Sequence, residues 1–113
     1  MRGKRGDGIC SGRMLEGIRL VDWSTLSNDL KVCYAIYEFD KVRKERIWFS
    51  KLVRVLDADA SKATISRTID KLFDLGIIDG KWEKVEGKWT RVLSVTGEAE
   101  DSVKGIYEST KRP

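Results

Sequence analysis

The most constraining feature of this chain is an amphipathic stretch that ends at a glycine and leads directly into an alternating pattern. Ile65, Ile69, Leu72 and Phe73 fall at i, i+4, i+7 and i+8, so they share one face of an α-helix. Gly76 follows, at the position that glycine favours just past a helix end. Polar and apolar residues then alternate on both sides of a Glu-Gly pair, which is typical of two antiparallel strands joined by a tight turn.

Helix caps and apolar spacing place the elements that precede this point. A loosely helical apolar pattern predicts a short helix over 13–22. Ser27 is a good N-cap for a second helix over 28–41. The charged segment 42–46 is too short for anything but a connection, and the bulky residues at 47–49 favour a short strand.

Two more helices flank the amphipathic stretch in the sequence. Ser50 can cap a helix with Leu52, Val53 and Leu56 on one face, and residues 57–60 break it. The amphipathic helix then starts after Ser61. Thr96 can cap a last helix, whose apolar stripe consists of Val103, Ile106 and Tyr107.

The order of these elements predicts the fold. Two short helices joined by a few residues form a helix-turn-helix, and a hairpin directly after the second helix makes it a winged helix. We therefore expect an α+β, mostly helical protein: a winged helix-turn-helix with a two-stranded wing and flanking N- and C-terminal helices. The expected bounds are a flexible basic arm at 1–12 and a single domain at 13–113, with the helix-turn-helix at about 50–76, the wing at about 77–95 and the C-terminal helix at about 97–110.

The composition excludes several kinds of chemistry. The 113 residues include no histidine, which excludes catalytic triads and histidine-ligated metal sites. Two cysteines, Cys10 and Cys33, are too few for a thiolate zinc site. We expect no enzymatic activity, no metal and no cofactor. No apolar run approaches the ~18–20 residues of a membrane span, and the basic N-terminus lacks the apolar stretch of a signal peptide. A cytoplasmic protein is therefore expected.

The composition also predicts a thermophilic source. Charged residues make up 35% of the chain, glutamine is absent, and Asn28 is the only asparagine. Thermophilic proteins tend to be rich in Lys, Glu and Arg and poor in thermolabile amides. Such a source weakens the usual rule against cytosolic disulfides, but a small buried hydrophobe on a helix is the better interpretation of Cys33.

Positive charge gathers in two segments, although the net charge is only +4. Residues 1–13 contain four basic residues against one acidic residue, and residues 41–54 contain six against one. Clustered basic charge favours a polyanionic partner, with an ordinary solvated surface as the alternative. The arm at 1–12 could enter a minor groove, or it could be a disordered terminus.

The segment Ser61–Leu72, followed by Leu75-Gly76-Ile77-Ile78, resembles winged-helix transcription regulators of the multiple-antibiotic-resistance (MarR) type and their archaeal relatives. Their recognition helix commonly has the pattern small-x-x-Thr-Val/Ile-Ser-Arg and ends in Leu-x-x-x-Gly-hydrophobic-Ile. The matching residues here are Thr64, Ile65, Ser66, Arg67, Leu72, Gly76 and Ile78. Leu93-Ser94-Val95-Thr96-x-x-Ala99 is similar to the family's Leu-Thr-x-x-Gly exit from the wing, with Ala99 replacing the glycine. The resemblance covers about residues 30–100.

Two features depart from the MarR pattern. The family often carries Asp-x-Arg in the wing, whereas the tip here is Lys84-Val85-Glu86-Gly87-Lys88. The family also dimerises through long terminal helices, and those expected here are short. The family's usual arginine contact from the wing is therefore in doubt for this chain.

A DNA-reading role can be assigned to the helical face opposite Ile65. A recognition helix presents its N-terminal residues to base edges in the major groove, where Arg67 could pair with guanine O6 and N7. Asp70 and Asp74 count against this role, because carboxylates near phosphates repel. The candidate DNA-binding residues are Ser61, Lys62, Ala63, Thr64, Ser66, Arg67, Lys71, Lys84, Lys88 and Arg91.

The leading functional hypothesis is therefore a sequence-specific transcriptional regulator that binds double-stranded DNA. Its recognition helix would lie in the major groove, and its wing would lie on the backbone or in the minor groove. The alternative is a winged helix that serves as a protein–protein interaction module.

The wing offers a geometric test of the register. If Glu86 and Gly87 are the two turn residues, Lys84 faces Trp89, and Trp82 faces Arg91 on the same side of the hairpin. This arrangement allows two cation–π pairs. The alternative is that both tryptophans pack on the core or on a partner chain.

Apolar residues outside the winged helix suggest a homodimer. Residues 13–23 and the stripe of the last helix exceed what a small winged helix needs to close its core. A partner chain could cover both segments and double the DNA contacts by two-fold symmetry. The alternative is that both segments fold back on their own domain. The sequence does not identify a small-molecule effector.

Overall fold

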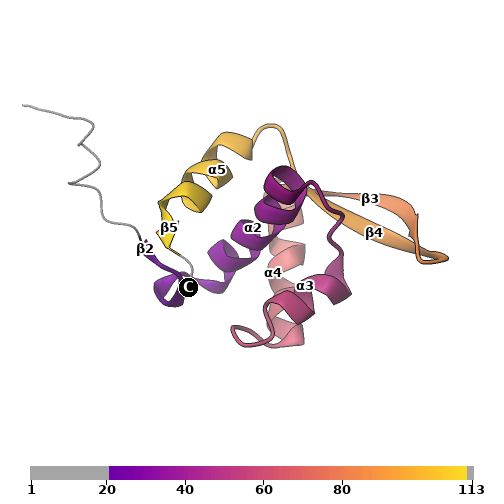
Figure 1. The fold of residues 1–113 in the computed structure, drawn as a ribbon, viewed down its shortest axis with the longest axis horizontal. Coiled ribbons are helices and arrows are strands. Elements are labelled where there is room, and N and C mark those ends of the chain that lie inside the picture. Colours follow the sequence, from indigo (N-terminus) through magenta and orange to yellow (C-terminus); the bar gives the residue numbers. More distant parts are fainter. Residues whose placement is uncertain (1–20, 112–113) are drawn as a thin grey trace, which may run out of the picture.

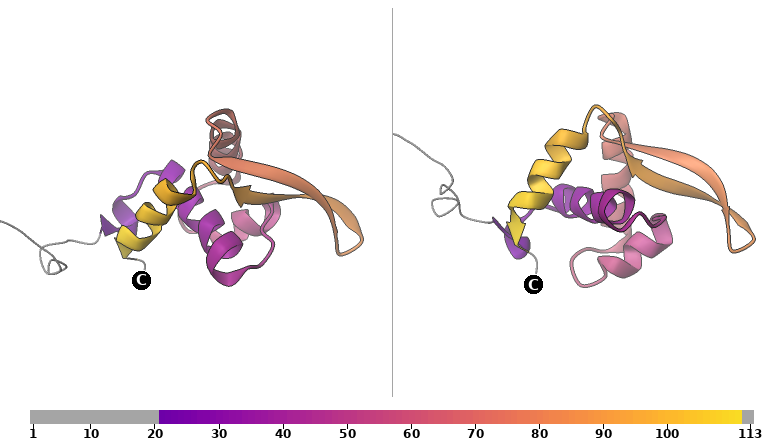
Figure 2. Two further views of the ribbon diagram at one scale, coloured as in Figure 1. Left: turned by 90° about the horizontal axis from the view of Figure 1, so that it is seen from above. Right: turned by 45° about the horizontal axis from the view of Figure 1, so that its top comes forward.

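The structure, a computed structural model, describes residues 21–111 and has the winged-helix architecture expected from the order of elements (Figure 1). The elements in chain order are β2 (Val21–Asp22), the 3-10 helix η1 (Trp23–Thr25), α2 (Asn28–Tyr37), the π-helix η2 (Glu38–Arg43), α3 (Phe49–Val55), α4 (Lys62–Asp74), β3 (Ile78–Val85), β4 (Lys88–Val95), α5 (Glu100–Ser109) and β5 (Thr110–Lys111). The β3–β4 wing projects from the helical body, on the side away from β2 and β5 (Figures 1 and 2).

Helix α2 forms the centre of the core. Its six consecutive residues from Val32 to Tyr37 are all buried, whereas an amphipathic surface helix buries only one stripe. Helices α3, α4 and α5 and strand β4 all contact it. The predicted cap is confirmed, because the Ser27 hydroxyl oxygen accepts a hydrogen bond from the backbone N–H of Leu30 at 3.3 Å.

The α2 helix does not end at residue 41 as expected but continues as the π-helix η2 to Arg43. Lys44, at φ 57°, takes the left-handed conformation that terminates it, and the N–H of Glu45 donates to Phe39 O at 2.8 Å. Within η2, the Asp40 carboxylate accepts a hydrogen bond from the backbone N–H of Val95 at 3.0 Å. The π-helix thereby ties the end of the central helix to the base of the wing.

The strand predicted at 47–49 is wrong, and so is the cap predicted at Ser50. Phe49 already belongs to α3, whose N-cap is Trp48. Ile47 is fully buried, and its carbonyl accepts one hydrogen bond, from the N–H of Leu93 at 2.8 Å. A single bond to β4 holds this segment against the wing without forming a ladder, so its bulky residues serve the core rather than a third strand.

The hairpin follows the predicted register. Trp82 pairs with Arg91 and Lys84 with Trp89 across antiparallel strands. Glu86 and Gly87 have φ values of 51° and 82°, as a two-residue type I′ turn requires at both central positions. Ser61 is the N-cap of α4, and Gly76, at φ 74°, follows its end, both as expected.

Thr96 does not cap the last helix. Helix α5 begins at Glu100 with Ala99 as its N-cap. The Thr96 hydroxyl instead donates to Gly76 O at 2.8 Å, and the Thr96 N–H donates to Ile77 O at 3.0 Å. These bonds join the exit of β4 to the end of α4, which delays the start of the helix by several residues.

Helix α5 folds back on its own chain. Val103 is buried, and the ring centroid of Tyr107 lies 4.6 Å from that of Tyr34 and 5.2 Å from that of Tyr37. The expectation that this apolar stripe awaits a partner chain is therefore wrong for Val103 and Tyr107. The arm at 1–12 and the helix predicted at 13–22 lie outside the described residues, except that Val21 and Asp22 form β2.

Strand β2 pairs in parallel with β5, through Val21 with Thr110 and Asp22 with Lys111. Within 21–111, no helix has the length and apolar content needed to cross a membrane. The same range contains no group of three or more histidine, cysteine, aspartate or glutamate side chains arranged to hold a metal ion.

Replacing Leu72 with alanine tests the helical phase of α4. Leu72 is 2% exposed, so Leu72→Ala should lower the free energy of unfolding by about 2–5 kcal/mol, through lost burial and a residual cavity. Val42, in η2, is 51% exposed, and Val42→Ala is the matched control, with an expected change within about 0.5 kcal/mol. Urea unfolding measures both changes; equal changes in the two variants would contradict this burial.

Cys33 should behave as an inert core residue. Burial, and secondarily the negative charge of Asp29, raises the pKa of its thiol from 9.0 to about 11. In a Cys10→Ser background, iodoacetamide at pH 8 should label Cys33 slowly in the folded protein and rapidly in urea. The thiol ionises at a lower pH in the unfolded chain than in the folded protein. The contribution of Cys33 to the free energy of unfolding should therefore be lost as pH rises from about 9 towards 11. Rapid labelling of the folded protein would show that the thiol is accessible.

Candidate nucleic-acid interface

The N-terminal half of α4 presents a polar face to solvent. Ile65 and Ile69 point into the core, and the opposite face exposes the side chains of Lys62, Ala63, Ser66 and Arg67. Neither Lys62 nor Arg67 forms an ion pair with any residue in 21–111. These two cations are therefore available to an external anion.

The helix start is organised by the predicted cap. Ser61 Oγ accepts a hydrogen bond from the backbone N–H of Thr64 at 3.2 Å and lies 2.9 Å from Thr64 Oγ1. Both hydroxyls are thus engaged with each other, and Thr64 is half-buried. Of the predicted contacts at this end, Ser61, Lys62 and Ala63 are exposed.

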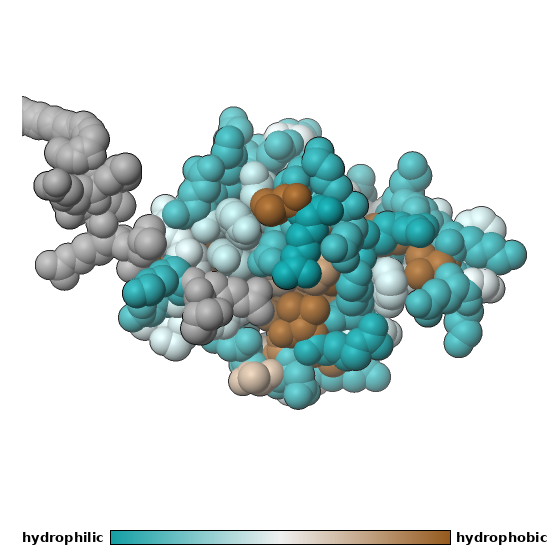
Figure 3. Space-filling view, in the orientation of Figure 1, coloured by the Kyte–Doolittle hydropathy of each residue, from teal (hydrophilic) through white to brown (hydrophobic). Residues whose placement is uncertain are grey.

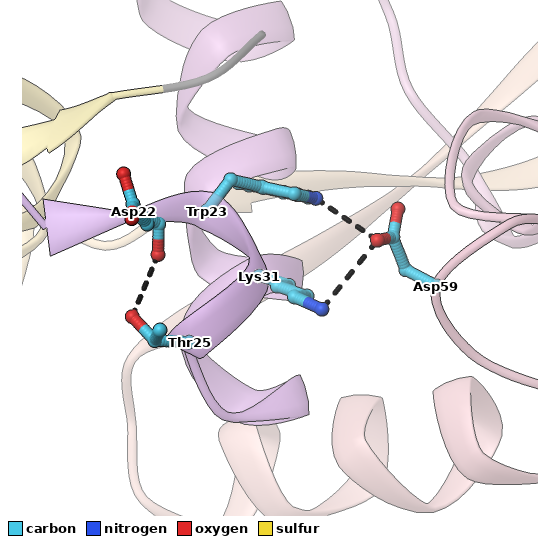
Figure 4. Close-up of polar contacts among 5 residues, drawn as sticks. All are labelled: Asp22, Trp23, Thr25, Lys31 and Asp59. Carbon is cyan, nitrogen blue, oxygen red and sulfur yellow. Dashed lines mark hydrogen bonds and ion pairs between the residues drawn. The ribbon is translucent and has the colours of Figure 1, made fainter.

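A polar cluster anchors the turn that precedes α4 (Figure 4). The indole Nε1 of Trp23 donates to Asp59 Oδ1 at 2.9 Å, and Lys31 Nζ lies 3.4 Å from the same oxygen. The side chains of Lys31 and Asp59 are only 11% and 20% exposed, so their attraction is screened less than that of a surface pair. The cluster thereby fixes the start of α4 to η1 and α2.

Lys71 is held by a neighbouring helix. Its Nζ lies 2.6 Å from Asp29 Oδ2 in the first turn of α2. This ion pair neutralises the charge of Lys71 within the protein and turns its side chain towards α2. The structure therefore separates Lys71 from the residues of α4 that have no acidic partner.

Arg91 packs against α4 rather than against the facing tryptophan. Its guanidinium carbon lies 4.0 Å from the centroid of the Phe73 ring. A Cβ at Gly80 would collide with Arg91 Nε, so the glycine leaves the space that the Arg91 side chain occupies. The sequence analysis missed both Phe73 and Gly80 in this role; a glycine inside a strand was the available signal.

The predicted register is thus correct, but the predicted ring contacts are not observed. The cation–π contacts of residues 21–111 involve other rings: Trp23, Phe39, Trp48 and Phe73. Trp82 and Trp89 are 64% and 68% exposed, so the alternative that they pack on the core is also wrong. Lys84 and Lys88 are exposed beside the turn of the wing.

Most of the basic residues in segment 41–54 form ion pairs within the protein. Arg43 pairs with Glu38 at 3.0 Å, and Arg46 with Glu83 at 3.4 Å. The remaining pairs join Lys41 to Asp40 and Glu100, and Lys51 to Glu45. These intramolecular pairs support the interpretation of a solvated surface over that of a row of phosphate contacts.

A crevice of about 200 Å³ joins α4 to the wing. Ser66, Asp70 and Phe73 line it from α4, and Arg91 and Leu93 line it from β4. The exposed face of α4 and the adjoining face of the wing therefore form one continuous surface. Asp70 places a negative charge on that surface, between its two halves.

Comparison with known proteins supports this architecture. No family model and no curated protein sequence match the chain. A PadR-like transcriptional regulator from Bacillus cereus aligns with a TM-score of 0.58 at 14% identity, over 72% of this chain and 78% of that one. The circadian clock associated protein Pex from Anabaena gives a TM-score of 0.58 at 19% identity, over 86% and 85% of the two chains.

The adhesin competence repressor AdcR from Streptococcus pyogenes aligns with a TM-score of 0.56 at 16% identity. The alignment covers 76% of this chain but only 58% of AdcR. At these identities the likeness concerns the fold. The chain shares the winged-helix fold of proteins that include transcriptional regulators.

Proposed function

We propose that this protein is a transcriptional regulator that binds double-stranded DNA in a sequence-specific manner. The observation that carries the proposal is the exposed N-terminal face of α4, on which Lys62 and Arg67 lack acidic partners within 21–111. This half of α4 enters the major groove, and the wing lies on the backbone or in the minor groove.

The residues of α4 have distinct roles in this proposal. Arg67 reads a guanine through its O6 and N7 atoms, which a guanidinium can contact together. Lys62 and the first backbone N–H groups of the helix, next to Ser61, hold a phosphate. Ala63, Thr64 and Ser66 offer methyl and hydroxyl contacts to base edges. Asp70, on the crevice towards the wing, faces away from phosphates or accepts from a cytosine amino group.

The wing contributes positive charge to the backbone. Lys84 and Lys88 flank its turn and are exposed. Arg91 supports the interface through its stack on Phe73, so it fixes the angle of the wing rather than acting as a free phosphate contact. The ion-paired Lys71 is the weakest of the candidate contacts.

The proposal extends to the type of regulator. The recognition-helix pattern over Thr64–Arg67 favours a MarR-like type with archaeal relatives. The composition, rich in charged residues and poor in amides, favours a thermophilic source, and we propose a cytoplasmic location. We place a basic arm at 1–12 before a single winged-helix domain at 13–113. A protein–protein interaction module remains the second candidate, because Asp70 and Asp74 lie exposed on α4.

Arg67→Ala tests the DNA-reading role. The variant should lose about 1–3 kcal/mol of binding free energy on the best site and relax specificity at one base pair. Lys104→Ala, which removes one exposed positive charge from α5, is the matched control and should leave the selected motif unchanged. DNA selection followed by fluorescence anisotropy measures both effects.

Salt dependence separates the two candidate functions. The logarithm of the DNA association constant of the wild-type chain should fall linearly with the logarithm of the salt concentration, with a slope of about −0.9 per phosphate contact. A protein–protein interface need not show this dependence. An unchanged motif and affinity in Arg67→Ala would remove that residue from the reading role.

We also propose a homodimer that uses the terminal segments. A hollow of about 530 Å³ lies between α2, α4 and α5, and its apolar lining includes Leu30, Leu75, Ile77 and Ile106. Leu75 is 61% exposed there. The apolar residues at 13–20 of a partner chain would cover this apolar hollow.

Sedimentation equilibrium at micromolar concentration tests the dimer. The expected result is a mass twice that of the 12.9 kDa chain. In such a dimer the recognition helices should lie about 34 Å apart, so the selected DNA site should be a pseudo-palindrome. Leu75→Glu should shift the equilibrium towards monomer, because it places a charge in the hollow; Glu108→Gln, on the exposed side of α5, is the control. A single species of monomer mass, both free and on DNA, would exclude the dimer.

A further inference from the structure

The two faces of the wing differ in chemistry. Trp82, Lys84, Trp89 and Arg91 share one face, because Trp82 is opposite Arg91 and Lys84 is opposite Trp89. We call these four residues the indole face. The acidic residues of the strands, Asp79 and Glu83, fall on the other face by the same alternation. The indole face therefore combines aromatic rings with positive charge and contains no carboxylate.

The two indoles are open to solvent. Trp82 and Trp89 are 64% and 68% exposed, and their positions are diagonal neighbours across the strands, about 7–8 Å apart. The face of the molecule that Figure 3 shows is mostly hydrophilic, with apolar residues in small patches. Two adjacent exposed tryptophans indicate a binding site, because large aromatic side chains are usually covered.

The indole face continues onto the proposed DNA-binding face of α4. Arg91 lies over Phe73 of α4, and the crevice between α4 and the wing is lined by Ser66 as well as Arg91. One elongated ligand can therefore contact both surfaces, and it passes the carboxylate of Asp70 between them. On the far face of the wing, Glu83 is paired with Arg46, which reduces the repulsion of a polyanion by the wing.

We propose that Trp82 and Trp89 stack on nucleobases that are unstacked from the duplex, so that the wing binds distorted or locally single-stranded DNA. This inference rests on the proposed function and adds a second mode of contact to it. Indole rings interact with any base through its π-face, whereas the bases of a regular duplex have both faces covered. Lys84, next to Trp89 on the same face, provides the charge for the adjoining phosphate.

The experiment compares an intact 20-base-pair duplex that contains the selected motif with the same duplex carrying a three-nucleotide bulge next to the motif. Fluorescence anisotropy gives the affinities of the wild-type chain, of Trp82→Phe/Trp89→Phe and of Trp82→Leu/Trp89→Leu. The phenylalanine variant keeps a ring that stacks, whereas the leucine variant keeps apolar character without a π-face. Circular dichroism confirms folding, which these exposed positions should not affect.

The wild-type chain should prefer the bulged duplex by at least about tenfold, since stacking is worth about 1–3 kcal/mol per base, or roughly 5- to 150-fold. The phenylalanine variant should keep most of that preference, and the leucine variant should lose it. As a second readout, 5-iodouracil placed in the bulge should crosslink to Trp82 or Trp89 of the wild-type chain on irradiation.

The outcomes distinguish the two proposals. If the wild-type chain binds both duplexes equally, or the leucine variant keeps the bulge preference, base stacking is wrong and the proposed function stands. If the leucine variant instead changes the sedimenting mass, the indole face contacts a second copy and base stacking is wrong. If the wild-type chain binds neither duplex, the proposed function itself fails. Arg67→Ala should lower binding to both duplexes alike.

Discussion

The burial of α2 on every side is the constraint on which the rest of the structure depends. Six consecutive side chains from Val32 to Tyr37 need cover, and no single neighbouring element provides it. Helix α4 covers one side, α5 another, and α3 and β4 the remainder. Because the covering elements come from both halves of the chain, the orientations of α4 and of the wing depend on the same core. This also explains why α5 is integral to the domain: Tyr107 packs on Tyr34 and Tyr37, which would otherwise face solvent.

Long-range polar contacts then fix the orientation of the elements that form the candidate interface. Asp59 joins the turn before α4 to Trp23 and Lys31, and Asp40 receives the backbone N–H of Val95 at the base of the wing. Thr96 connects the exit of the wing to the end of α4. The bonds of Asp59 and Asp40 are partly shielded from water, where polar interactions are stronger than at an open surface, whereas the bond from the Thr96 hydroxyl to Gly76 O is exposed. These contacts hold α4 and the wing in a defined relative orientation.

Charge along the chain is a poor guide to the charge that an external ligand meets. The densest basic segment, 41–54, is mostly paired with nearby or distant acids, including Arg46 with Glu83. Lys62 and Arg67, on a helix with an ordinary mixture of charges, have no acidic partner within the described residues. The face of the wing that bears the tryptophans is free of carboxylates only because strand alternation places Asp79 and Glu83 on the other side.

The sequence alone determined the features that depend on local periodicity and turn chemistry. These include the apolar stripe of α4, its cap at Ser61, the glycine after its end, and the hairpin register, since a Glu-Gly turn admits one pairing. The tertiary structure decided what depends on partners distant in the chain. Ile47 joins β4 through one hydrogen bond instead of a ladder, Lys71 is neutralised by Asp29, and Arg91 stacks on Phe73. Such partners lie 18 to 46 residues away, and a local pattern carries no information on which of several possible neighbours a side chain meets in the folded state.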